Sequence, residues 1–210
     1  MQPDVIIVGA GLAGLSCARE LSREGQQVLV LESSACVGGR VVTEEVDGFR
    51  IDRGFQVYND AYPEGHRYFD PQTLSFGYFE PGALLSHHGR LQCLCDPWRQ
   101  PFAALRSILD GSIGLMDGFR TARLRSEAIH LFRKRELDPD LITHGTEKNT
   151  IDELRNRGFS ESFIQKFFIP FFGGVFLERH LETAASVFLF NFAMFALGRA
   201  CLPRGGMGAL

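Results

Sequence analysis

The sequence predicts an α/β protein in which a parallel βαβ unit is followed by a mainly helical region. The first observation is that residues 4–10 (DVIIVGA) form an apolar, β-branched run typical of a strand buried on both faces of a parallel sheet, and residues 26–33 (QQVLVLES) indicate a second buried strand. The second is the helical spacing of apolar residues from about residue 97 onward. With 210 residues, the chain can form one large or two small domains.

The segment between the two predicted strands is expected to be a helix. Leu12, Leu15, Ala18 and Leu21 share one face at helical spacing, and Gly25 is a suitable stop signal. Together with the flanking strands, this helix completes the βαβ unit.

Three glycines join the first strand to the helix with the spacing G-x-G-x-x-G. Gly9 would make the tight turn, Gly11 would let the backbone approach a pyrophosphate, and Gly14 would let the helix pack closely on the sheet. Leu12 and Ala13 begin the helix, whose free N–H groups and positive dipole end face the phosphates. An ordinary strand-to-helix turn is the alternative, and the flanking elements argue against it.

An acidic residue follows at the end of the second predicted strand. Glu32 lies 21 residues after Gly11, close to the spacing at which an acid accepts hydrogen bonds from ribose hydroxyls. An acid at this position also argues against a cofactor with a 2′-phosphate. The pattern therefore predicts a Rossmann-like dinucleotide-binding domain.

A second glycine turn follows the acid in the stretch LESSACVGGR. Gly38 and Gly39 can adopt backbone angles that are closed to other residues, so the chain can bend back over a ligand on the helix N-terminus. Arg40 would then place a permanent cation beside the pyrophosphate. A nicotinamide enzyme does not require this second clamp, which suits a cofactor kept bound through many turnovers. The alternative is a turn with a surface arginine.

At this point the chain resembles the superfamily of FAD-dependent amine oxidases, phytoene (carotenoid) desaturases and protoporphyrinogen oxidases. The resemblance rests on VIIVGAGLAGL, LESSACVGGR and DGFRIDRGFQVYN. It implies an FAD cofactor, with Glu32 and the adjacent Ser33 at the adenosine ribose. It also implies that Gly38, Gly39 and Arg40 lie along the diphosphate and ribityl region.

The third of these stretches matches the segment that approaches the flavin ring in the family. By resemblance, Asp52, Gly54 and Phe55 occupy the matching positions, while Arg53 replaces the small residue that is commoner there. The residues themselves also predict a β-hairpin, because Asp47-Gly48 stands between two strand-like runs.

Three helices are predicted in the second half of the chain. A capping box of Thr150 and Glu153 would begin the first, and Gly158 would end it. A second would run from residue 160 until Pro170 ends it. The third spans residues 182–198.

Phenylalanine is concentrated in this part of the chain. Ten of the 19 phenylalanines lie between Phe163 and Phe195, and Phe188, Phe192 and Phe195 form one helical stripe. They could line a pocket for an apolar substrate, but a phenylalanine stripe at this spacing is more often buried core, which we favour. By resemblance, residues 167–186 and 202–210 are similar to a desaturase-like subgroup.

Residues 119–137 predict a basic amphipathic helix, with Leu124, Ala128 and Leu131 on its apolar face. Such a helix can make peripheral contact with an anionic membrane, but it is more often a solvated outer face, which we favour. The cations on the remaining faces are Arg120, Arg123, Arg133, Lys134 and Arg135.

Composition and termini exclude several classes. A net charge of −3 argues against a nucleic-acid partner. The start of the chain lacks a signal-peptide pattern, and its five scattered cysteines do not form a disulfide framework, so we expect a cytoplasmic protein. The cluster His87, His88, Cys93 and Cys95 lacks a second pair of metal ligands, so no metal site is expected.

The predicted organisation has three parts. Residues 1–90 form the N-terminal part of the FAD-binding fold, residues 91–200 the first part of an inserted, mainly helical substrate domain, and residues 201–210 begin the return to the FAD domain. Because no further βαβ unit follows residue 57 and the sequence stops in a glycine-rich turn, we expect a truncated chain.

The predicted function is an FAD-dependent oxidoreductase of the amine oxidase or desaturase type. The flavin would accept a hydride equivalent from a C–N or C–C unit of a small, apolar substrate. No catalytic residue is assigned. The alternatives are a non-catalytic nucleotide-binding remnant, a nicotinamide-dependent dehydrogenase and a redox-neutral flavin mutase.

Overall fold

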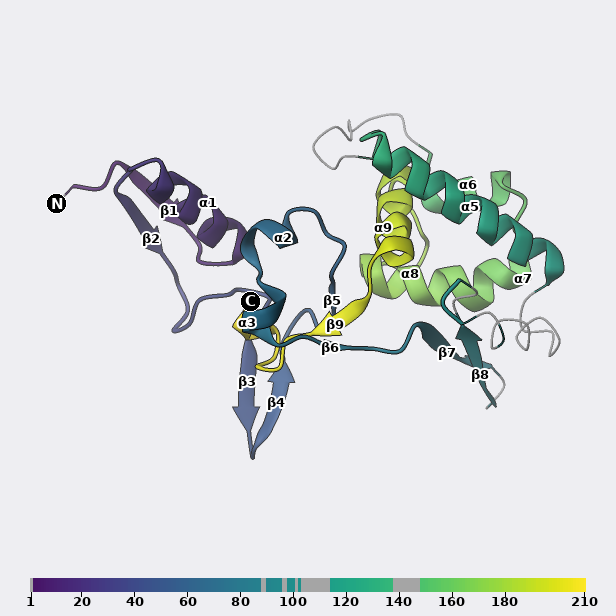
Figure 1. Cartoon of the computed structure of the whole chain (residues 1–210), viewed down its shortest axis with the longest axis horizontal. Coiled ribbons are helices and arrows are strands. Elements are labelled where there is room, and N and C mark those ends of the chain that lie inside the picture. Colours follow the sequence, from purple (N-terminus) through teal and green to yellow (C-terminus); the bar gives the residue numbers. More distant parts are fainter. Residues whose placement is uncertain (1, 88–89, 96–97, 101, 103–113, 138–147) are drawn as a thin grey trace. The chain divides into compact units, whose positions relative to one another are not determined.

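The structure is a computed structural model that describes residues 2–87, 90–95, 98–100, 102, 114–137 and 148–210, with the backbone alone for residues 83, 85–87 and 90–95. It divides into two compact units (Figure 1). Unit 1 comprises Met1–Phe79 and Arg199–Leu210, and unit 2 comprises Glu80–Gly198. Unit 1 is therefore built from two segments that are far apart in the sequence.

Unit 1 begins with the predicted βαβ unit. Strand β1 (Val5–Val8) pairs in parallel with β2 (Val28–Leu31), and α1 (Leu12–Arg23) connects them. Gly25 follows the helix with a φ of +83°, which confirms it as the stop signal.

The expectation that both strands are buried, the first on both faces, is wrong for the described chain. Ile7 lies under α1, whereas Ile6 and Val8 on the other face are 57% and 85% exposed. The reason is that α1 covers one face of this two-stranded sheet, and no described element buries the other.

The predicted hairpin follows. Strand β3 (Thr43–Val46) pairs antiparallel with β4 (Phe49–Asp52), and Asp47 and Gly48 form the turn with φ values of +52° and +81°. Two consecutive residues with positive φ match the twist of the flanking strands, which confirms the turn signal.

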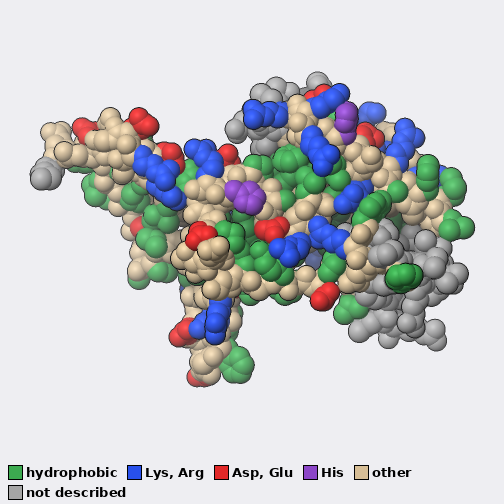
Figure 2. Space-filling model, viewed as in Figure 1, with side chains coloured by type: hydrophobic (Ala, Val, Ile, Leu, Met, Phe, Trp, Pro, Cys, Tyr) green, Lys and Arg blue, Asp and Glu red, His purple; other side chains and the backbone are tan. Residues whose placement is uncertain are grey.

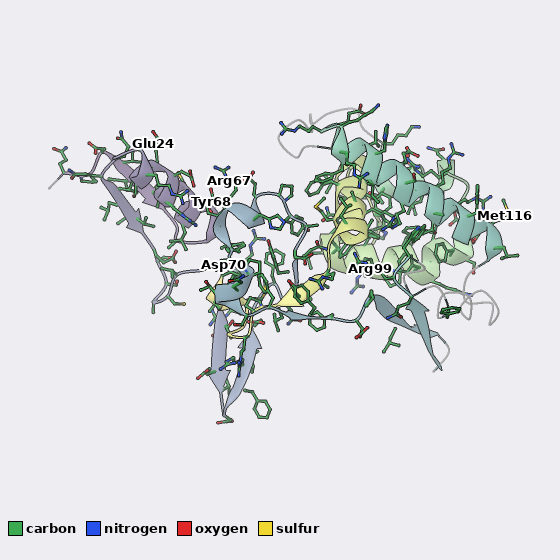
Figure 3. All side chains as sticks on the ribbon, in the orientation of Figure 1. Glu24, Arg67, Tyr68, Asp70, Arg99 and Met116 are labelled. Carbon is green, nitrogen blue, oxygen red and sulfur yellow. The ribbon has the colours of Figure 1, made fainter. Side chains whose placement is uncertain are left out.

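A second sheet of unit 1 joins distant parts of the chain. Strand β9 (Ala200–Leu202) lies between β5 (Tyr58–Asn59) and β6 (Gly77–Tyr78), antiparallel to both. The short helices α2 (Gly65–Tyr68) and α3 (Pro71–Leu74) lie between β5 and β6 in sequence, and the 3₁₀ helix η3 (Met207–Ala209) follows β9. Arg19 of α1 lies 5.1 Å from the ring centre of Tyr68, which Figure 3 labels on α2.

The described part of unit 2 contains a hairpin and several helices. The hairpin pairs β7 (Gly82–His87) with β8 (Arg90–Cys95), strands that were not predicted. In the helical region expected from about residue 97 onward, residues 103–113 lie outside the described residues. The remaining elements are α5 (Leu115–Arg133), α6 (Thr150–Asn156), α7 (Glu161–Phe163), the π-helix η2 (Ile164–Phe168), α8 (Ile169–Phe176) and α9 (Ala185–Leu197).

Phenylalanine rings form the core of unit 2. Phe168, Phe172 and Phe188 are at most 1% exposed. The ring centres of Phe172 and Phe188 lie 4.8 Å apart, edge to face, and those of Phe168 and Phe188 lie 6.0 Å apart. These central phenylalanines therefore pack against one another, as expected for buried core.

The predicted capping box of α6 is wrong. Asn149 precedes the helix, and its Oδ1 accepts a hydrogen bond from the Asp152 amide. Thr150 is buried as the first helical residue, and its hydroxyl donates to the Thr183 carbonyl over 2.7 Å. Asparagine is a better capping residue than threonine, and the bond to the Thr183 carbonyl gives the Thr150 hydroxyl another partner. Gly158 follows the helix with a φ of +81°, as predicted.

The expectation that Pro170 ends the second helix is also wrong. The helix continues through η2 into α8 and stops at Phe176. Pro170 lies in the first turn of α8, directly after the π-helical turn. Proline is tolerated at the start of an α-helix because its missing N–H would have no partner there, and the change of hydrogen-bonding pattern creates such a start within a continuous helical run.

Candidate functional site

The glycine turn after β1 shapes the start of α1. Gly9 has a φ of +99°, in the left-handed region that favours glycine. A Cβ atom on Gly14 would lie 2.0 Å from the Gly9 carbonyl oxygen, so the helix can approach the turn this closely only with glycine there. Gly11 precedes the helix, and a Cβ atom built on it would meet nothing within 4 Å. The backbone therefore borders open space at the helix N-terminus.

The residues that begin α1 leave this end accessible. Leu12 and Ala13 are exposed, and no side chain of the described chain caps the helix at Gly11. The first turn of a helix presents N–H groups without intrahelical partners and the positive end of the helix dipole. This end of α1 can therefore bind an anion.

Glu32 connects the glycine turn to the segment after β2. Its Oε2 accepts from the Ala10 amide over 2.7 Å, and its Oε1 accepts from the amide and the hydroxyl of Ser34, each over 2.9 Å. The Ser33 hydroxyl lies at 3.4 Å. These bonds, led by the one from Ala10, lower the pKa of Glu32 to about 2. The exposed carboxylate is thus ionised and free to accept a further hydrogen bond.

The second glycine turn contacts the first. The Gly38 amide donates to the Ala10 carbonyl over 2.8 Å, and Gly38 and Gly39 have φ values of +108° and +61°. A Cβ atom on Gly39 would lie 3.2 Å from the Gly11 Cα, which is tighter than most real contacts. The two turns therefore meet at the beginning of α1.

Arg40 joins this turn to the segment after the hairpin. The Phe55 amide donates to the Arg40 carbonyl over 3.2 Å, and a Cβ atom on Gly54 would lie 2.1 Å from the same oxygen. The Arg40 guanidinium carbon lies 5.5 Å from the centre of the Phe55 ring, within cation–π range. The structure thus brings Arg40, Gly54 and Phe55 together, with the guanidinium exposed.

Asp52 lies in a hydrogen-bond network that the sequence did not predict. Its Oδ1 accepts from the Thr43 hydroxyl over 2.5 Å and from the Met207 amide over 2.9 Å. The Gly208 amide donates to the Thr43 hydroxyl oxygen over 2.7 Å. Asp52 therefore holds η3 against the hairpin. The sequence signal for this network was the polar pair Thr43 and Asp52 at opposed positions of the predicted hairpin. The Met207 amide, which completes the network, lies 155 residues after Asp52.

The contacts to Glu32 also extend the predicted set. Ser33 was predicted beside the ribose acid, but Ser34 makes the two shorter bonds to Glu32. Ala10 contributes its amide, which no side-chain pattern could reveal. A serine pair after an acid was the only signal, and it left the choice between the two serines open.

The sequence predicted neither a metal site nor a membrane-spanning helix, and the described residues bear on both. Within the described ranges, no group of three or more His, Cys, Asp or Glu side chains could hold a metal ion. In the cluster from His87 to Cys95, His88 lies outside the described residues and the other side chains are not described, so the expectation of no metal there stays a prediction. No helix in the described part of the chain is both long and apolar enough to cross a membrane.

The geometry of unit 1 defines a class of protein. A parallel βαβ unit, open backbone at the start of its helix and an acid after β2 characterise dinucleotide-binding folds. In this chain a second glycine turn also lies on the helix start. FAD fits this arrangement, because an added Cβ atom at Gly11 meets no protein atom while Gly14 and Gly39 allow close approach of the surrounding backbone.

The chain belongs to the flavin containing amine oxidoreductase family, whose model matches residues 12–210. This membership confirms the predicted superfamily and FAD as its cofactor. It also agrees with the predicted α/β fold.

Several known proteins are similar to parts of the chain. Pseudooxynicotine dehydrogenase from a Pseudomonas species is 45% identical over 51 residues, which are 24% of this chain and 10% of that protein. Carotenoid 3,4-desaturase from Haloarcula japonica is 43% identical over 75 residues, 35% of this chain and 15% of that protein. The matched segments thus cover a small fraction of these relatives.

The fold is similar to that of larger solved structures. Putrescine oxidase bound to putrescine superimposes with a TM-score of 0.63 at 20% identity, over 100% of this chain and 47% of that one. A fatty acid isomerase from P. acnes superimposes with a TM-score of 0.61 at 17% identity, over 93% and 44%. The chain therefore spans about half the length of these structures.

Proposed function

We propose that unit 1 holds the adenosine and diphosphate part of FAD in an oxidoreductase that removes a hydride equivalent from a C–N or C–C unit of a small substrate. The observation that carries this proposal is the meeting of the two glycine turns at the start of α1, where Gly39 lies against Gly11. A single turn would suffice to hold a dinucleotide, whereas two turns enclose it from two sides.

Each side chain near these turns has a specific role in the proposal. Glu32 accepts hydrogen bonds from ribose hydroxyls, for which its lowered pKa keeps it ionised. Ser33 and Ser34 orient the carboxylate, and Arg40 supplies a positive charge for the diphosphate. Bound flavin would supply the acceptor for the hydride equivalent.

The segment after the hairpin is proposed to border the flavin ring. Gly54 packs on the Arg40 carbonyl, which fixes the position of Phe55 relative to the second glycine turn. Asp52 faces the Met207 amide and the Thr43 hydroxyl, so its role in this proposal is to position η3 rather than to contact the ring.

The class of reaction is proposed from the relatives rather than from a pocket. One relative is named a pseudooxynicotine dehydrogenase and another a carotenoid 3,4-desaturase. Both names describe oxidation of an organic molecule, which supports the proposed class of reaction. The central phenylalanines of unit 2 are packed against one another and supply no wall for a substrate.

The test is flavin retention by the purified 210-residue chain, measured as visible absorbance after excess FAD is removed. Arg40→Ala should weaken FAD binding about tenfold, the value of one charge-assisted hydrogen bond. Arg23→Ala is the matched control, because Arg23 is an exposed cation of the same unit at the other end of α1. Equal affinities of the two variants would contradict the assigned role of Arg40.

The same experiment separates the proposal from a nucleotide-binding remnant. Retained flavin that loses its visible absorbance when an amine or a carotenoid precursor is added supports an oxidoreductase. Flavin that is retained but never reduced supports the remnant. If the chain retains no flavin, the measurement is repeated with a version extended to the length of putrescine oxidase. Flavin retained by the longer version would show that further residues are needed to bind FAD, whereas no retention would contradict the proposed cofactor.

A further inference from the structure

One face of α5 exposes large apolar side chains at the beginning of the helix. Leu115, Met116 and Phe119 are 72%, 61% and 67% exposed. The opposite face is buried in unit 2, where Leu124 and Ala128 are 1% and 0% exposed. Figure 3 shows Met116 at the start of α5, at the outer edge of the view. These three side chains do not belong to the apolar face that the sequence pattern predicts.

The same exposed face continues as a row of cations. Figure 2 shows Lys and Arg side chains over the surface where Figure 1 places α5. Arg123 lies one turn after Phe119, and further exposed basic residues follow toward and past the end of the helix. These are His130, Arg133, Lys134 and Arg135. We call the exposed apolar and basic residues of this row the α5 face.

The two acidic residues of α5 offset these cations only in part. Asp117 is buried, and it accepts hydrogen bonds from the amide and hydroxyl of Ser160. Glu127 binds both terminal nitrogens of Arg157 over 2.8 Å. Glu127 also interacts electrostatically with Arg123, and the exposed Glu136 offsets one of the cations past the helix end. The α5 face is therefore apolar at its beginning and carries a net positive charge toward its end.

A hollow of about 560 Å³ adjoins this face, between α5 and α6. Its lining includes Met116 and Phe119, the cations Arg123 and Lys148, and the acids Glu127 and Glu153, which both bind Arg157. Apolar and cationic groups thus line the same hollow, and its two acids are paired with an arginine.

We propose that the α5 face docks on the surface of an anionic lipid bilayer. Leu115, Met116 and Phe119 enter the boundary between headgroups and acyl chains, while Arg123, Arg133 and Lys134 contact lipid phosphates. Helices that lie in the plane of a membrane surface combine an apolar face with cations in this way. The proposal concerns unit 2 alone and is independent of flavin binding.

A second copy of the chain is a less suitable occupant of this surface. A two-fold contact that pairs two antiparallel α5 faces would place the apolar end of each copy against the cationic end of the other. Cations buried against apolar side chains without a counter-charge destabilise such an interface, whereas the negative charge of an anionic bilayer complements them. Charge complementarity therefore favours an anionic bilayer over a second copy of the chain as the occupant of the α5 face.

The test is flotation of the 210-residue chain with lipid vesicles. Vesicles of phosphatidylcholine alone are compared with vesicles that contain about 30% phosphatidylglycerol, enough to give a strongly negative surface. The chain should float with the anionic vesicles and release from them as salt is raised. The triple variant Arg123→Gln, Arg133→Gln, Lys134→Gln should reduce the partition coefficient on the order of 100-fold, at about fivefold per charge.

Apolar and charge controls make the test specific. Met116→Ser with Phe119→Ser should reduce binding at least tenfold, since both side chains would leave the lipid. Leu177→Ser, at a leucine of unit 2 that is 82% exposed, should leave it unchanged. The charge control neutralises three other exposed cations of unit 2, Arg155, Lys166 and Arg179.

The outcomes decide the proposal in either direction. Selective loss of vesicle binding in the α5 variants supports it, with far-UV circular dichroism showing that these variants are folded. An equal loss of vesicle binding in the control variants would overturn the proposal. So would vesicle binding that Met116→Ser with Phe119→Ser leaves unchanged. Concentration-dependent dimerisation abolished by the same α5 variants would instead assign the face to a second copy and overturn the membrane proposal.

Discussion

The contact between Gly14 and Gly9 leads to a specific prediction about Gly14→Ala. A real Cβ atom essentially never lies within 3.0 Å of such a neighbour, yet the new one would lie 2.0 Å from the Gly9 carbonyl oxygen. The start of α1 must therefore move by about 1 Å. Overpacking of this kind costs about 1–3 kcal/mol, and the better helix propensity of alanine returns about 0.5–1 kcal/mol. We expect a net loss of about 1 kcal/mol in the stability of unit 1, within a range of roughly 0–2.5 kcal/mol.

The assay combines urea unfolding with flavin affinity. Unfolding is followed by circular dichroism, and the midpoint of the unit 1 transition should fall without a change in slope. FAD affinity should fall at least tenfold, because the displaced helix end carries the N–H groups for the phosphates. Gly174→Ala is the control, since Gly174 is exposed in α8 with nothing within 4 Å of an added Cβ atom.

The control should behave in the opposite way. Gly174→Ala is expected to stabilise its helix by about 0.5–1 kcal/mol and to leave FAD affinity unchanged. If Gly14→Ala also stabilised the protein, or kept its FAD affinity, the close approach of α1 to the glycine turn would not be required, and the reasoning would be refuted.

Three further predictions concern charged and polar contacts. Because the pKa of Glu32 is lowered to about 2, its contribution to stability is complete above about pH 4.5 and is lost as the pH falls through 2; Glu32→Gln should flatten acid unfolding curves in this window. Arg157→Ala, which removes the hydrogen-bonded partner of two partly buried glutamates, should cost about 1–2 kcal/mol by urea unfolding, whereas Arg155→Ala at an exposed, solvent-screened pair should leave the unfolding midpoint nearly unchanged. Thr43→Val removes the partner of Asp52 and of the Gly208 amide, and should cost about 1–2 kcal/mol and speed hydrogen exchange at residues 207–209.

The βαβ unit and the hairpin could be predicted from the sequence because their signals are local. An apolar run, a glycine turn and a helical spacing lie within about 30 residues, and each constrains the backbone directly. The same is true of Asp47-Gly48, whose positive φ values define the turn. The predicted cofactor followed from these local patterns and the family resemblance.

The features that could not be predicted depend on distant partners. Thr150 left the capping position to Asn149 because its hydroxyl binds the Thr183 carbonyl. Pro170 did not end its helix because a π-helical turn precedes it. Neither the Thr183 carbonyl nor the π-helical turn has a signature in the local sequence.

Strand β9 has a consequence for the order of folding. It completes a sheet with β5 and β6, yet it is synthesised more than 100 residues after them. Until β9 is synthesised, the edges of these short strands lack their partner. The β5–β9–β6 sheet of unit 1 therefore cannot form while the residues between β6 and β9 are still being translated.

Early folding of unit 2, which lies between β6 and β9 in the sequence, would speed the pairing of β9 with β5 and β6. Closing a loop of unfolded chain costs entropy that rises with its length, but a folded unit 2 replaces most of that loop with a rigid body. Substitutions in the phenylalanine core should therefore slow the assembly of the distant β5–β9–β6 sheet. The rate at which the first segment becomes protected from proteolysis during refolding measures this dependence.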